Sequence, residues 1–336
     1  MTGERGACLP FLPNHCWTGS RVPFGSILEI SALTSLPHQI PPLPGKLSKV
    51  LQTRGKTLTL DMAPDTFDDA YTDCVEDMEQ VAPILLQEEM AQHKLFRESW
   101  EAARASFKSY QNLSLPPGFQ TQHALAVMVY TNSSNSLHRE LNLAVRELGS
   151  SIEAYLDNFP FKALHFYLMR ALQLLRNPES CKEDSGQEVF RGKRSTHFKP
   201  RKLGDIIRLG QFTSTSEERK VAQMFGNATF FTLSTCFGVP IKDLSVFPNE
   251  REVLIPPNEV FQVSNFSQDG TQNLVTLRSL KKTCSNFNCA YLKKEKIENC
   301  ELKSGNINST VLGKVTPWLF VGTQLLLLRI FCLTSS

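Results

Sequence analysis

The first third of the chain shows the spacing of apolar positions that is typical of helices. Residues 58–112 are rich in Glu, Ala, Gln and Met, and apolar side chains recur at helical intervals over residues 73–103. A Pro-Pro-Gly sequence at 116–118 then interrupts the pattern. We therefore expect a mostly helical region that ends before this break.

Three further apolar segments follow the break. Residues 124–130 form an apolar run, and residues 137–148 and 161–176 have the periodicity of helices. The last segment, FKALHFYLMRALQLLR, is apolar on most of its sides, so we expect a buried helix there.

The pattern changes after residue 181 to short runs rich in β-branched and aromatic residues. Turn residues such as Gly, Pro, Asn and Asp bound these runs, as is typical of strands. The runs are EVFRG at 188, IIRLGQF at 206, TFFTLSTC at 229, REVLIPP at 251, EVFQVSNF at 259 and NLVTLRSL at 273. Helices followed by strands, with no internal repeat, predict an α+β domain.

Length and charge limit the class of protein. A chain of 336 residues is long enough for one sizeable domain with additional segments at its ends. The formal net charge is only +3, from 36 Lys and Arg against 33 Asp and Glu, and no basic stripe is present. We therefore expect no nucleic-acid partner.

Cysteines and glycosylation motifs indicate an oxidising compartment. Six of the nine cysteines fall in the globular part, and an even number suits a disulfide framework, although free thiols are the alternative. No Cys-x-x-Cys pair occurs, so we expect no metal. The six are Cys74, Cys181, Cys236, Cys284, Cys289 and Cys300. Asn-x-Ser/Thr motifs begin at Asn112, Asn132, Asn227, Asn265 and Asn308.

The two ends of the chain differ in how clearly they indicate targeting. Residues 317–334 are almost wholly apolar, follow a polar spacer, and come after the small residues Ser304, Gly305 and Asn306. This order predicts a signal for a glycosylphosphatidylinositol (GPI) anchor, with Ser309 as a competing attachment site and a tail-anchored helix as the alternative. Residues 1–57 offer only interrupted apolar pieces and several prolines, which do not form a clear secretory signal.

Candidate chemistry lies in three strand-like pieces. They contain Arg191 in Phe-Arg-Gly, Ser214 in Phe-Thr-Ser-Thr-Ser, and the pair Glu250 and Glu252 in Glu-Arg-Glu. Each piece alone is common on ordinary sheet surfaces. In an extended strand, residues two apart face the same way, so we expect the two glutamates to project together.

Together and in this order, the three pieces resemble the R-S-E signature of arginine-specific vertebrate ecto-mono-ADP-ribosyltransferases. The resemblance extends from residue 58 to residue 300. Its segments include APDTFDDAYTDC at 63, MVYTNSSN at 128, FPFKALHFYL at 159, VFRG at 189, RLGQFTSTS at 208, FGNATFF at 225, EREVLIPP at 250 and NFNCAYL at 286. It implies an ADP-ribosyltransferase fold, with a helical N-terminal half and two facing small β-sheets around a central cleft for NAD.

The resemblance also implies roles for the carboxylates. Breaking the bond between nicotinamide and ribose produces an oxocarbenium-like transition state, which a neighbouring carboxylate stabilises. Glu252 takes this role by resemblance and holds the ribose 2′-hydroxyl. Glu250 would bind the protonated guanidinium of the acceptor and help to remove a proton from it. Relatives with Gln at the first position tend towards NAD hydrolysis.

The remaining site residues are carried over in the same way. Arg191 would bind the pyrophosphate and ribose of NAD, since a planar guanidinium fork suits that anion. Gly192 would let the backbone approach the cofactor closely, and Ser214 would orient Glu252. Three further residues match positions that line the NAD site: Tyr130, Gln211 and Ser245. Phe225 would either stack on nicotinamide or belong to the core.

The resemblance implies two disulfides, Cys74 with Cys289 and Cys181 with Cys236, which leaves Cys284 with Cys300 as our inferred third pair. It places a catalytic domain at 58–300 between an N-terminal segment, 1–57, and a C-terminal spacer and tail, 301–336. We expect an enzyme that uses NAD to modify arginines of surface or extracellular proteins, with no metal. It would pass through the endoplasmic reticulum and be secreted or lipid-anchored. An NAD glycohydrolase or a catalytically silent recognition protein are the alternatives.

Overall fold

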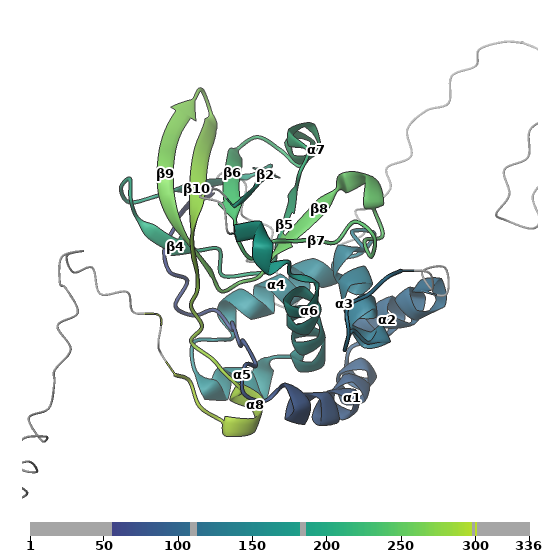
Figure 1. Cartoon of the computed structure of the whole chain (residues 1–336). Coiled ribbons are helices and arrows are strands. Elements are labelled where there is room, and N and C mark those ends of the chain that lie inside the picture. The colour runs from purple at the N-terminus through teal and green to yellow at the C-terminus, as the bar shows by residue number, and fades with distance from the viewer. Residues whose placement is uncertain (1–55, 108–112, 182–185, 298–299, 301–336) are drawn as a thin grey trace, which may run out of the picture. The chain divides into compact units, whose positions relative to one another are not determined.

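The structure is a computed structural model that describes residues 56–107, 113–181, 186–297 and 300. The C-terminal segment 301–336 and all but the last two residues of the segment 1–57 lie outside the described residues, so the domain limits stay predictions. Within the described part, most of the helices gather on one side of the fold and the strands on the other (Figure 1). The α+β class is confirmed.

Most of the helices come before residue 181, as the apolar pattern predicts, and α6 lies among them. Nine of the side chains of α6 are buried, and it packs against α1 and α3. No helix within the described residues is both long and apolar enough to span a membrane. The helices are α1 (Val75–Gln92), α2 (Lys94–Phe107), α3 (Thr121–Thr131), α4 (Leu137–Glu147), α5 (Ile152–Asn158), α6 (Lys162–Leu175), α7 (Arg219–Met224) and α8 (Ala290–Lys293). In the described part of the chain, the 3₁₀ helices are η2 (Pro178–Cys181) and η3 (Pro248–Glu250).

The strands form an eight-stranded sheet in the order β4-β9-β10-β6-β2-β5-β8-β7 and a two-stranded sheet, β1-β3. Within the larger sheet the pairs are antiparallel, except for the parallel pair β6 and β10. The strands are β1 (Lys56–Thr59), β2 (Gln187–Lys193), β3 (Thr196–Lys199), β4 (Ile206–Arg208), β5 (Thr213–Ser216), β6 (Thr229–Thr235), β7 (Val239–Pro240), β8 (Glu252–Ile255), β9 (Glu259–Asp269) and β10 (Gln272–Thr283).

The connection between β2 and β5 refines the expectation of two facing sheets. These strands are joined by a single residue pair, Phe190 with Ser216. On one side of this junction lie β4, β9, β10, β6 and β2, and on the other side lie β5, β8 and β7. Hydrogen bonding therefore makes one sheet of the two parts, and the narrow junction lies beside Arg191 and Ser214.

A buried ion pair ties the sheet to the segment that precedes the helices. The side chains of Arg208 on β4 and Asp68 are both fully buried and paired with each other. Arg208 also donates to the carbonyl oxygens of Met62 and Ala63, at 2.8 and 2.9 Å. Asp68 accepts from the backbone N–H of Asn286 at 2.7 Å. The segments at 63 and 286 that carry part of the family resemblance thus meet around this pair.

All three expected disulfides are present. Cys74 is bonded to Cys289, and Cys181 is bonded to Cys236. Cys284 is bonded to Cys300. The first bridge joins the residue before α1 to the residue before α8, close to the buried ion pair.

Candidate active site

The site is centred on Glu252, the first residue of β8. Its side chain is only 5% exposed, and its backbone lies opposite Ser216 of β5. The pKa of Glu252 is raised to about 7 by burial, which is the largest cause, and by the charge of Glu250. Hydrogen bonds from Ser214 and Ser245 and the charge of Arg191 oppose this rise in pKa. The structure therefore brings four predicted site residues together around one carboxylate.

Arg191 and Tyr130 complete this centre. Arg191 extends from β2 and donates from Nη1 to the backbone carbonyl of Ser214 across the narrow junction. The Tyr130 hydroxyl, on α3, donates to the carbonyl of Phe212 at 2.9 Å and lies 3.4 Å from Ser214 Oγ. Asn142 of α4 donates to the same hydroxyl at 3.1 Å. Tyr130 thus fixes the strand that carries Ser214.

Positive charge gathers beside Glu252. The pKa of Lys193 lies well below its ordinary value, first because Arg191 is close and then because of burial and Arg146. The pKa of His138 is lowered to about 4 by burial, which is the largest cause, and by the charges of Arg139, Lys193 and Arg191. The arginines and Lys193 exceed the single buried carboxylate in charge. This excess suits a ligand that carries several negative charges.

Spacing along two elements explains the cationic cluster. Arg191 and Lys193 are two apart on β2 and therefore share a face. His138, Asn142 and Arg146 follow one another at intervals of four on α4, which places them on one helix face. The sequence analysis missed Lys193, His138, Asn142 and Arg146. For the three residues on α4, the regular spacing of four is the sequence signal by which they can be found.

The expected geometry of Glu250 is wrong, because it does not share a strand with Glu252. Glu250 ends η3, in which Pro248 occupies the first turn, a position that proline favours. Arg251 then adopts a left-handed conformation, with φ 46°, before β8 begins. Glu250 is half-buried and still acts electrostatically on Glu252. A turn, and not the strand period, brings the two carboxylates near each other.

The surroundings of three other expected residues are as follows. A Cβ on Gly192 would lie 2.3 Å from the Ala222 carbonyl oxygen, so glycine is needed there for packing against α7. Gln211 accepts a hydrogen bond from Arg146 through its side chain. Phe225 is 49% exposed at the end of α7, so the interpretation as a core residue is wrong.

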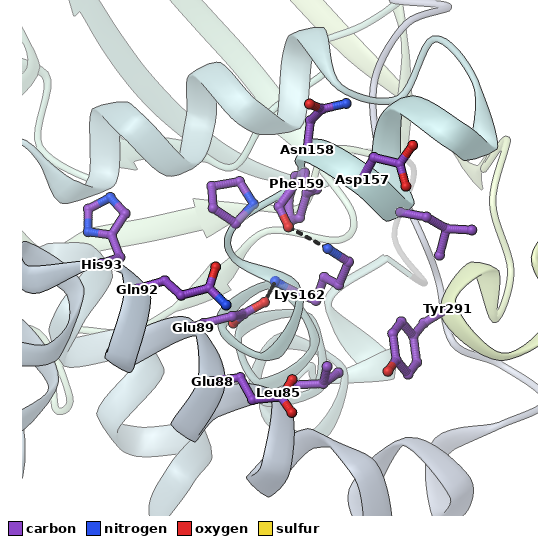
Figure 2. A pocket seen from close by; sticks show the side chains of 12 residues that line it. Leu85, Glu88, Glu89, Gln92, His93, Asp157, Asn158, Phe159, Lys162 and Tyr291 are labelled. Carbon is purple, nitrogen blue, oxygen red and sulfur yellow. Dashed lines mark hydrogen bonds between the residues drawn. The ribbon is translucent and has the colours of Figure 1, made fainter.

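A separate cavity of about 490 Å³ lies between α1, α5 and α8 (Figure 2). Of the described residues that line it, none is a predicted site residue. Glu89 accepts there from the backbone N–H groups of Lys162 and Ala163, at the start of α6. This carboxylate caps a helix, so Glu89 has a structural role beside the cavity. Among the described residues, no group of three or more His, Cys, Asp or Glu side chains is placed to hold a metal ion.

Comparison with known proteins decides the family. The sequence model described as NAD:arginine ADP-ribosyltransferase matches residues 60–285. The chain belongs to this family. It is 62% identical over 244 residues to ecto-ADP-ribosyltransferase 5 of Rattus norvegicus, covering 72% of this chain and 79% of that protein. It is 40% identical over 289 residues to GPI-linked NAD(P)(+)–arginine ADP-ribosyltransferase 1 of Mus musculus, covering 82% and 84%.

A solved structure shares the fold of this ADP-ribosyltransferase. It is a mutant of the mono-ADP-ribosyltransferase ART2.2 in complex with NAD, with a TM-score of 0.60 and 39% sequence identity. The match covers 70% of this chain and 99% of that one. The chain is therefore an enzyme of the class that transfers ADP-ribose to arginine, with NAD as co-substrate.

Proposed function

We propose that Glu252, Glu250 and Arg191 divide the transfer of ADP-ribose to arginine between them. The observation that carries this proposal is the buried Glu252, held by two serine hydroxyls beside a group of cations. The bond between ribose C1′ and the nicotinamide nitrogen breaks, and its electron pair leaves with nicotinamide. The ionised Glu252 stabilises the positive charge that develops on the ribose.

Three cationic side chains bind the diphosphate of NAD. Arg191 binds the diphosphate of NAD through its planar fork, and the neighbouring Arg146 and Lys193 add positive charge. Tyr130, Gln211 and Ser245 hold the surrounding strands and Glu252 in place. His138 gains affinity for a proton when the diphosphate compensates its cationic neighbours.

Glu250 serves the acceptor. A guanidinium stays protonated at neutral pH and is a poor nucleophile. The carboxylate of Glu250 binds it, and accepts a proton as the arginine nitrogen forms its bond to C1′. Glu250 is more exposed than Glu252, as a group that meets an incoming protein must be.

The test is the Glu250→Gln variant assayed for both nicotinamide release and ADP-ribosyl-agmatine formation. We expect transfer to fall by about 10²-fold or more while NAD hydrolysis persists. Glu252→Gln should lose both products, and Glu188→Gln, an exposed carboxylate on β2, should keep both. Equal loss of the two products from a folded Glu250→Gln variant contradicts the role. Hydrolysis without transfer by the unmodified protein identifies a glycohydrolase, and neither product identifies a silent protein.

We also propose that the protein acts on arginines of surface or extracellular proteins from the outer face of the cell. The names of the relatives, which include "ecto" and "GPI-linked", support this location. Asn227 and Asn265 are exposed and accessible for glycosylation. The apolar tail and its anchor site lie outside the described residues. Phosphatidylinositol-specific phospholipase should release the protein from expressing cells; retention with the tail still detected points to a spanning helix.

A further inference from the structure

Arg251, between the two site glutamates, has an unusual conformation for an arginine. Its φ of 46° and ψ of 50° lie in the left-handed region, which costs free energy for a residue with a Cβ. The turn formed by η3 and Arg251 must therefore be held by its surroundings.

Ion pairs hold the Arg251 side chain. Its Nε and Nη2 donate to Glu217 Oε2 at 3.0 and 2.9 Å, and its Nη1 lies 3.3 Å from Glu218 Oε1. Glu217 Oε1 in turn accepts from Gln187 Nε2 of β2 at 2.8 Å. The guanidinium is thus fixed to the residues that follow β5, and through Glu217 to β2.

Backbone hydrogen bonds tie the same turn to β5. Ser216 Oγ donates to the carbonyl oxygen of Glu250 at 2.7 Å, and the N–H of Glu217 donates to the carbonyl oxygen of Arg251 at 3.2 Å. The N–H of Glu218 donates to Ser216 Oγ at 3.0 Å. Hydrogen bonds from Ser216 and Glu217 therefore hold the carbonyl groups of both Glu250 and Arg251.

We propose that Arg251 is a positioning residue that directs the Glu250 carboxylate at the acceptor arginine. Its ion pairs with Glu217 and Glu218, called the clamp below, hold this turn in place. The inference rests on the proposed role of Glu250. Arg251 touches no reacting atom, because Glu217 and Glu218 engage its guanidinium. Without the clamp, Glu250 loses its fixed direction, whereas Glu252 remains fixed in β8 by its pairing with β5.

The clamp therefore governs the division between transfer and hydrolysis. Transfer depends on the alignment of a bound guanidinium with C1′, and small displacements of a positioning group reduce such reactions strongly. Nicotinamide release depends on Glu252, which the clamp does not hold. Because the Arg251, Glu217 and Glu218 side chains are 53%, 26% and 49% exposed, the ion pairs add little to overall stability. The variants should therefore fold.

The test compares Arg251→Gln with Lys220→Gln, which removes the same charge from an exposed position on neighbouring α7. Nicotinamide release and ADP-ribosyl-agmatine formation are measured for each protein at saturating agmatine. We expect Arg251→Gln to lower transfer by about tenfold and to change hydrolysis by less than about twofold. Lys220→Gln should keep the ratio of the unmodified protein. An unchanged ratio in Arg251→Gln overturns the proposal.

Two further variants separate the clamp from the backbone strain. Arg251→Gly accepts the left-handed conformation freely but has no side chain, so it should behave like Arg251→Gln. Arg251→Lys retains one charge and should recover part of the transfer. If Arg251→Gly transfers as well as the unmodified protein, the ion pairs have no positioning role.

Salt provides a second, independent measurement. Raising ionic strength from about 20 mM to about 500 mM screens exposed ion pairs, so the transfer-to-hydrolysis ratio of the unmodified protein should fall. The ratio of Arg251→Gln should be less sensitive to salt, and equal sensitivity contradicts the clamp. If Glu250→Gln loses transfer and Arg251→Gln does not, only the clamp is wrong. If Glu250→Gln keeps transfer, the proposed function fails first.

Discussion

At the scale of single residues, the pH dependence of NAD cleavage depends on Glu252. Burial raises its pKa to about 7, and only the ionised form stabilises a developing cation. We therefore expect kcat/KM for nicotinamide release to rise with pH and to reach half its maximum near pH 7, because kcat/KM reports on the free enzyme. Nicotinamide release at low NAD concentration from about pH 5 to about pH 9 measures this profile.

Glu250 provides the control for this pH profile. Its negative charge raises the pKa of Glu252, so Glu250→Gln should shift the midpoint to lower pH. Glu188→Gln should leave the midpoint unchanged. If the midpoint of the pH profile is the same in Glu250→Gln and in the unmodified protein, a group other than Glu252 controls the profile.

Lys193 allows a second prediction at this scale. If it binds the diphosphate, Lys193→Gln should raise KM for NAD by about tenfold, since a hydrogen bond to a charged group contributes about 1.5–3 kcal/mol. The value of kcat should change little, because the lost contact is made equally in the ground state and the transition state. Steady-state kinetics measure both, with Lys199→Gln, at an exposed position on β3, as the control. A fall in kcat alone argues against binding.

The sequence predicted the residues of the carboxylate centre but not those of the cationic cluster. Arg191, Ser214 and Glu252 lie in segments that resemble a known signature. Lys193 and Arg146 resemble ordinary surface cations in the sequence. Only the folded structure brings them close enough to interact with each other and with Arg191. The relation of Glu250 to Glu252 was predicted from strand spacing, and a left-handed residue between them replaced that spacing with a turn.

At the scale of elements, the start of α6 depends on a carboxylate from another helix. The α6 N-cap residue makes no side-chain cap hydrogen bond, and Glu89 of α1 accepts from the first two N–H groups instead. Burial raises the pKa of Glu89 from 4.5 to about 8. The folded state therefore holds a proton that the unfolded state releases between these values. This group's contribution to stability is present at low pH and is lost as pH rises from about 4.5 to about 8.

Glu89→Gln should remove that part of the pH dependence. The amide stays neutral and keeps an oxygen that accepts one N–H, so the melting temperature should fall less between pH 5 and pH 8 than in the unmodified protein. Glu76→Gln, at an exposed position near the start of the same helix, should retain the original dependence. Thermal melting at several pH values decides this, and parallel curves for Glu89→Gln and the unmodified protein contradict it.

The sequence pattern predicted the long helices, whereas it did not predict the shortest helices and strands. The apolar periodicity predicted α4 and α6 to within a few residues, because tertiary burial of one face sets that periodicity. The 6-residue α7 and the 4-residue β3 are too short to carry a period. Their positions depend on contacts with β2 and with β1, which no local pattern contains.

At the scale of the whole molecule, segments far apart in sequence meet at one junction. Asp68 pairs with Arg208, and Asp69 accepts from the N–H groups of Cys289 and Ala290 at 2.8 and 2.7 Å. The Cys74–Cys289 disulfide closes the same junction. The family resemblance predicted the Cys74–Cys289 bridge. The structure adds the carboxylates of Asp68 and Asp69, which accept hydrogen bonds from the backbone beside Cys289.

The three disulfides should differ in their contributions to stability. A bridge stabilises mainly by restricting the unfolded chain, and this effect grows with the loop that it closes. The sequence separations are 215, 55 and 16 residues for Cys74–Cys289, Cys181–Cys236 and Cys284–Cys300. Replacing each pair with serine should therefore cost the most free energy of unfolding for the first bridge, about 4–5 kcal/mol, and about 3 kcal/mol for the last.

The site residues and the bridged cysteines are on different elements, so the ranking should appear in stability before it appears in catalysis. Denaturant unfolding of the three double-serine variants measures the free energies, and peptide mapping without reduction checks that the remaining bridges keep their pairing. Nicotinamide release at a low temperature should stay close to that of the unmodified protein for each variant that is folded. If removing Cys284–Cys300 destabilises more than removing Cys74–Cys289, chain entropy does not govern the bridges, and contacts at the C-terminal segment must dominate instead.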